Sequence, residues 1–239
     1  MINTIIPAIT SIISLIFAII VLDQYLVNKK AYQLVWFFGL LLYFISTGCA
    51  FLIELNGLTE VKYLLWYICG ATLVAAYLGM GTIYLLIQKR IANIIMIALV
   101  VASITAIILI SIADVDIKLL PASGPILSGD ALPKSVRWLT PTFNTFGTIA
   151  LVGGAGYSAY HYWSHRLLRH RVTSNILIAA GALLAAAGGL VARWGYESFL
   201  YWSELLGIIL IFIGFLRSSE KFGFDRIPLI HRFLRKSTD

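Results

Sequence analysis

Long apolar runs dominate this sequence and constrain its fold more than any other feature. A helix must contain about 20 mainly apolar residues to cross a hydrocarbon core of about 30 Å. Seven segments meet that requirement: 5–26, 31–55, 61–87, 91–113, 140–162, 174–194 and 199–216. Because a backbone in lipid must satisfy its own hydrogen bonds, these segments predict an all-α polytopic membrane protein, a bundle of seven transmembrane helices.

The composition agrees with a membrane protein. Hydrophobic residues make up 60% of the 239 residues and charged residues 12%, whereas about a quarter of the residues of a soluble domain are charged. The net charge of +7 does not indicate nucleic-acid binding, because the basic residues lie in short segments between apolar runs. The expected partners are membrane lipids, a small-molecule ligand or a partner membrane protein, and no nucleic acid.

The distribution of Lys and Arg predicts an orientation. Thirteen of these residues lie beside the connections on one side of the bundle and five lie on the other side. The positive-inside rule then places the N-terminus outside and the C-terminus in the cytoplasm of a cell-membrane protein. We expect a transmembrane domain over residues 1–216, with a Pro- and Gly-rich outer loop at 114–139. A basic tail, 217–239, follows as a short interfacial helix or as a frayed end.

Two expected spans carry faces of small residues at helical spacing. These are Gly147, Ala150, Gly154 and Ser158 in the fifth, and Gly181, Ala185, Gly188 and Ala192 in the sixth. Small residues allow helices to approach closely in lipid, where hydrophobic burial does not drive association. We therefore predict that the fifth and sixth spans pack closely, although the pattern does not determine which faces meet.

A stripe of tyrosines and glycines runs along the third expected span. Its members lie within about 100° of one another on a helix: Tyr63, Tyr67, Gly70, Tyr77, Gly81 and Tyr84. The tyrosines are expected to face inward, where two interpretations remain. They line a hydrated path or a cleft for a flat aromatic ligand, or each hydroxyl bonds a neighbouring helix.

Ionisable residues within spans are costly and are the first candidates for function. The topology brings three of them to the outer half of the bundle, with polar residues of other spans at the same level. The expected binding site consists of Glu54, Tyr67, Asn144, Thr148, Arg193, Tyr201 and Glu204. Two interpretations remain for these residues. They bind a cationic or polar solute or a proton, or they form a structural salt bridge between the last two spans, with Glu54 in headgroup water. Asp23 is expected at the inner interface, within reach of cytoplasmic water.

Neither a metal nor a cofactor is expected. Cys49 and Cys69 lie in apolar runs without metal-binding spacing. His161 and His165 stand four residues apart, but their segment contains no carboxylate and is strongly basic, which favours contact with anionic headgroups over a metal site. The last span also lacks the lysine that a retinal Schiff base needs.

Three functions from different classes remain. The favoured hypothesis is a non-catalytic membrane protein that binds a lipid, a small apolar ligand or a partner membrane protein within the bundle. The alternative is a transporter or channel for protons or a small solute that uses the outer Glu and Arg residues. An enzyme is least favoured, because no nucleophile, base and orienting group can be assembled from the sequence.

Overall fold

The computed structural model describes residues 2–116, 119, 127–165, 169–192 and 198–218. Within these ranges the chain forms helices and turns and no strand, as the sequence predicts. Six helices are long and apolar enough to cross a membrane, namely Thr4–Asn28, Ala31–Asn56, Glu60–Leu86, Lys89–Ser111, His170–Val191 and Phe199–Arg217. They correspond to six of the seven expected spans.

The span Glu60–Leu86 is built from three successive helical elements, and the other five are single helices. The first half of the chain forms α1 (Ile2–Asn28), α2 (Ala31–Asn56), α3 (Glu60–Trp66), the π-helix η1 (Tyr67–Leu73), α4 (Val74–Leu86) and α5 (Lys89–Ser111). The second half forms the 3-10 turn η3 (Gly129–Ala131), α6 (Lys134–Arg137), α7 (Leu139–Thr148), the π-helix η4 (Ile149–Gly153), α8 (Gly154–Ser164), α9 (Arg169–Ala192) and α10 (Ser198–Arg217).

The remaining expected span is the continuous run of α7, η4 and α8 over residues 139–164. The run is long enough to cross a bilayer, but Thr, Asn, Gly, Tyr and His replace many of its aliphatic residues. It is therefore not among the six strongly apolar helices. Since it packs between α4 and α9, much of its surface faces protein and needs less apolar character.

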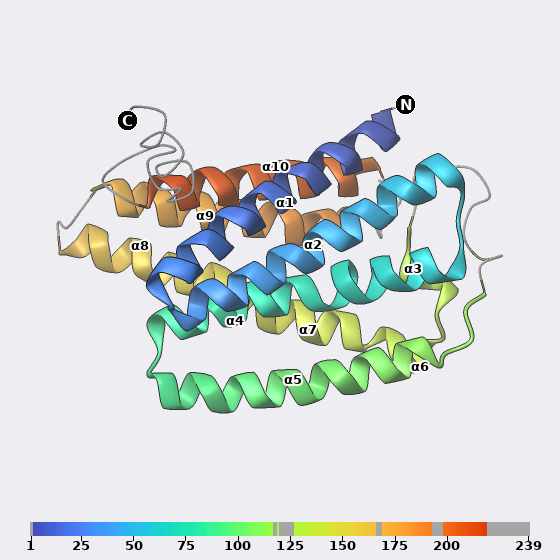
Figure 1. Cartoon of the computed structure of the whole chain (residues 1–239), viewed down its shortest axis with the longest axis horizontal. Coiled ribbons are helices and arrows are strands. Elements are labelled where there is room, and N and C mark those ends of the chain that lie inside the picture. Colours follow the sequence, from blue (N-terminus) through green and yellow to red (C-terminus); the bar gives the residue numbers. More distant parts are fainter. Residues whose placement is uncertain (1, 117–118, 120–126, 166–168, 193–197, 219–239) are drawn as a thin grey trace, which may run out of the picture.

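The helices form a closed ring of contacts. Neighbours in the ring are α1, α2, α3–α4, α7–α8, α9 and α10, and α10 returns to α1 (Figure 1). Helix α5 lies outside this ring at one edge of the molecule, against α4, η1 and α6 (Figure 1). We call the end at which α2 finishes and α3 begins the Glu54 end, and the opposite end, where α4 finishes and α5 begins, the Lys89 end.

Short turns set the positions of the first helices. Lys29 takes a left-handed conformation with φ of 51° between α1 and α2, and Gly57 takes φ of 79° after α2. The positive φ of Gly57 marks a turn at Asn56-Gly57. Thr59 then caps α3, because its side chain accepts a hydrogen bond from the amide of Lys62.

Aromatic side chains fill the core toward the Lys89 end. The Phe17 ring of α1 lies 6.3 Å from that of Trp36 in α2 and 5.0 Å from that of Phe215 in α10. Trp36 and Phe215 are also in contact, at 6.1 Å between ring centroids. These rings therefore join α1, α2 and α10 into one interface.

Small residues create the closest helix contacts. A Cβ atom added to Gly181 of α9 would lie 2.6 Å from the carbonyl oxygen of Gly207 in α10, and one added to Gly79 of α4 would lie 2.6 Å from that of Gly147 in α7. Helices α8 and α9 contact each other, as predicted for the fifth and sixth spans. Their small residues, however, make the tightest contacts with α4 and α10, because those helices also present glycine or alanine at the contact.

We predict that Gly181→Ala lowers the free energy of unfolding by about 1–3 kcal/mol, because the added methyl group must separate α9 from the backbone of α10. The matched control is Gly189→Ala in the same helix, where an added Cβ atom meets nothing within 4 Å. Thermal unfolding of both variants in detergent measures the difference. Equal melting temperatures for the two variants would contradict the described α9–α10 contact.

Candidate functional site

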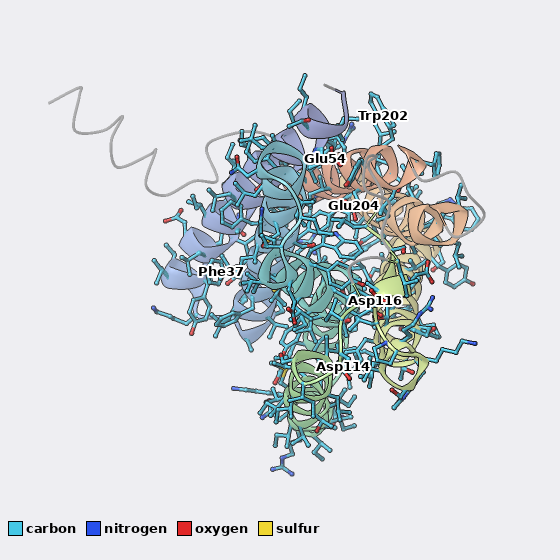
Figure 2. The ribbon with its side chains drawn as sticks, turned by 90° about the vertical axis from the view of Figure 1, so that its right-hand side faces the viewer. Phe37, Glu54, Asp114, Asp116, Trp202 and Glu204 are labelled. Atoms are coloured by element: carbon cyan, nitrogen blue, oxygen red, sulfur yellow. The ribbon has the colours of Figure 1, made fainter. Side chains whose placement is uncertain are left out.

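Helices α2 and α10 bring two carboxylates and two tyrosines together near the Glu54 end. Tyr43 and Glu54 are eleven residues, or three turns, apart on one face of α2, and Tyr201 and Glu204 are one turn apart on α10. The Tyr201 hydroxyl interacts electrostatically with both Glu54 and Glu204. The Tyr43 hydroxyl donates to the backbone oxygen of Glu204 at 3.0 Å. Figure 2, which looks along the bundle, shows Glu54 and Glu204 on the same side of the molecule, away from Asp114 and Asp116.

The polar groups of this cluster have few protein partners. Tyr201 is only 2% exposed, and its hydroxyl has no hydrogen-bond partner within the described part of the chain. Both carboxylates are half-buried. In the described part of the chain the ion pair found is Arg137–Asp130, at 2.5 Å, so no described cation neutralises Glu54 or Glu204. Arg193, which the sequence predicted beside them, lies outside the described residues.

Aromatic and apolar side chains surround the same region. The rings of Tyr63, Trp66 and Tyr67 lie about 6 Å from one another, at centroid distances of 5.9, 6.1 and 6.0 Å. Tyr201 and Leu205 belong to the same packed cluster as these rings. Tyr201 is therefore part of the apolar core to which these rings belong. Ring faces of this kind attract cations.

A second polar network contains the other predicted site residues. Thr140 of α7 donates to the Tyr67 hydroxyl at 2.8 Å and lies 3.2 Å from the hydroxyl of Thr72. Asn144 donates its side-chain amide to the carbonyl oxygen of Ala71 at 2.9 Å. These bonds join η1 to α7, so Tyr67 and Asn144 have a structural role here. Thr148, at the last residue of α7, is half-buried.

The remaining tyrosines of the third span also have partners. Tyr77 donates to Ser103 at 3.4 Å and Tyr84 to Asn93 at 2.9 Å, both on α5, while Tyr63 donates to the carbonyl oxygen of Ser128 at 2.8 Å. The interpretation that these hydroxyls bond neighbouring segments is confirmed. The stripe attaches the peripheral helix α5 and the residues before η3 to the bundle.

Tyr43 was not among the predicted site residues. Its signal was the helical spacing of residues 43, 47, 50 and 54, combined with an inward-facing hydroxyl.

The two histidines that stand four residues apart at the end of α8 contact each other. The rings of His161 and His165 lie 4.4 Å apart, and His165 Nδ1 lies 2.9 Å from the His161 carbonyl oxygen. Among the described residues, no group of three or more His, Cys, Asp or Glu is arranged to hold a metal ion.

Comparison of the chain with models of protein families, with curated protein sequences and with solved structures gave no match.

We predict that Thr140→Val lowers the free energy of unfolding by about 1 kcal/mol, because it removes the donor to Tyr67 and the contact with Thr72 inside the bundle. Thr142→Val is the matched control, since Thr142 is exposed and bonds the carbonyl oxygen of Trp138 in its own turn. Denaturant titration of the two variants compares them. An effect of Thr142→Val as large as that of Thr140→Val would contradict the assigned network.

Proposed function

We propose that this protein is a non-catalytic membrane protein that binds a small ligand with one positive charge and an apolar body, at Glu54, Tyr201 and Glu204. The observation that carries the proposal is the buried Tyr201 hydroxyl, which has no hydrogen-bond partner among the described residues and lies within electrostatic range of two carboxylates that no described cation neutralises. A buried polar group without a partner costs about 1–3 kcal/mol, and an unpaired charge costs more. A cationic ligand offsets both costs.

The surroundings favour an organic cation over a bare metal ion. The aromatic cluster of Tyr63, Trp66 and Tyr67 supplies ring faces and apolar surface, whereas a divalent metal site needs several oxygen ligands close together. Tyr201 supplies a hydroxyl that donates to a carboxylate or accepts from an ammonium group. The ligand class is therefore a lipophilic ammonium or phosphonium-type ion.

The topology is part of this proposal. We place α7–η4–α8 across the membrane as the seventh span, which puts the Glu54 end outside the cell membrane and the Lys89 end in the cytoplasm. Support comes from the continuous helical run 139–164 between α4 and α9, and from the excess of Lys and Arg beside the connections of the Lys89 end. The ligand then enters from the extracytoplasmic side or from the outer leaflet.

Transport is the second candidate function. Two facing spans contain π-helical segments, since η1 contacts α7 and η4 contacts α4. Such segments occur often at functional sites, and interrupted helices are common in transporters. In this case the same cation crosses the bundle, and Glu204→Gln abolishes its flux into reconstituted vesicles.

Binding of tetraphenylphosphonium tests the favoured function. We expect the purified protein to bind this ion, and Glu204→Gln to weaken the Kd about tenfold, since one of two carboxylates loses its charge. Isothermal titration in detergent measures the affinity. The matched control is Glu60→Gln, which neutralises an exposed carboxylate at the same end and should leave the Kd unchanged. No measurable binding by the parent protein, or equal loss in both variants, would contradict the site.

The seventh crossing has its own test. On a background without Cys49 and Cys69, Ser135→Cys before α7 and Ser164→Cys at the end of α8 introduce exposed thiols. A membrane-impermeant maleimide added to intact cells should label the first variant and should label the second only after permeabilisation. Labelling of both from the same side means that 139–164 does not cross the membrane.

A further inference from the structure

Three buried polar side chains lie near the Lys89 end of α1 and α2 without complete pairing. Asp23 is 6% exposed, Gln24 7% and Gln33 3%. Asp23 Oδ2, Gln24 Nε2 and Gln33 Oε1 have no hydrogen-bond partner among the residues that the structure describes. Asp23 was expected in contact with cytoplasmic water, so its burial differs from that expectation.

Gln24 and Gln33 lie at the α1–α2 interface, and Asp23 directly precedes Gln24 on α1. Gln24 follows Phe17 by seven residues on α1, and Gln33 precedes Trp36 by three residues on α2, so each lies on the same helix face as its aromatic neighbour. The Phe17 and Trp36 rings are in contact, at 6.3 Å. One to two turns further toward the Lys89 end, the same α1–α2 interface therefore changes from aromatic to polar. The two-residue connection between the helices places Gln24 and Gln33 within about one turn of the same level.

Nearby cations do not neutralise Asp23. Lys29 directs its ammonium group to the Tyr25 ring, 5.3 Å from the centroid. Lys30 directly precedes α2, and Arg217 is the last residue of α10. Both side chains are exposed, and neither forms an ion pair among the described residues. The charge of Asp23 is thus buried and unpaired within the described residues, an arrangement that native proteins stabilise with a bound ion or ligand.

We infer that Asp23, Gln24 and Gln33 form a binding site for a small monovalent cation at the Lys89 end of the α1–α2 interface. Asp23 supplies one carboxylate oxygen and Gln33 one amide oxygen, and the Gln24 amide supplies a second amide oxygen when it is rotated by 180° in the same space. Oxygen ligands suit hard cations, and a single carboxylate with two neutral amides matches one positive charge better than two. This site is separate from the one at Glu54 and Glu204, and it does not depend on the function proposed there.

Thermal unfolding of the purified full-length protein in detergent tests the site. Sodium or potassium chloride replaces N-methyl-D-glucamine chloride at constant ionic strength, so that screening does not change. We expect one of the alkali ions to raise the melting temperature in a saturable manner, because a ligand that binds the folded state stabilises it. The exposed-carboxylate control Asp114→Asn should retain this dependence, and Asp23→Asn should lose it.

Two further variants make the outcome decisive. Gln33→Leu keeps the carboxylate and should raise the half-saturating cation concentration about tenfold, which serves as the test if Asp23→Asn does not fold. Glu204→Gln should retain the full dependence, which separates this site from the organic-cation site. A melting temperature that is equal in the three salts, a dependence unchanged by Gln33→Leu, or a loss caused by Glu204→Gln would each overturn the proposal.

Discussion

Backbone contact at small residues is the interaction on which this bundle depends. Lipid is as apolar as the side chains, so helices gain little from hydrophobic burial and associate through packing and hydrogen bonds. Gly181 against Gly207, and Gly79 against Gly147, let α9 approach α10 and α4 approach α7 until backbone atoms meet. These pairs set the order of the ring of helices, and with it the positions of α2 and α10, which carry the proposed ligand site.

Hydrogen bonds within and between helices satisfy most of the buried polar side chains of the described residues. Thr140 and Asn144 join α7 to the π-helical segment η1, and Tyr77 joins α4 to α5. Buried atoms without a partner in the described part of the chain include the Tyr201 hydroxyl near one end of the bundle and atoms of Asp23 and its neighbours near the other. Since orphaned buried polar atoms are rare in native proteins, both places are where the chain is expected to meet something outside itself.

Hydropathy and turn signals predicted the helical class, the six strongly apolar helices and the turn at Gly57, because these depend on local sequence. The proximity of Glu54 and Glu204 also followed from topology alone. The helix that each small-residue face contacts could not be predicted. Gly147 meets α4 and Gly181 meets α10, and the spacing of small residues within one helix does not indicate its partner. The π-helical segments and the burial of Asp23 depend on tertiary packing and have no local signal.

A cryo-electron-microscopy structure of the protein in lipid nanodiscs, prepared with tetraphenylphosphonium, tests the central claim most directly. The account predicts density for the ion in contact with Tyr201, between Glu54 of α2 and Glu204 of α10 (Figure 2). It also predicts that the rings of Tyr63 and Trp66 keep their present packing around it. Density for the ion elsewhere in the bundle, or a Tyr201 hydroxyl hydrogen-bonded to protein with no ion beside it, would contradict the account.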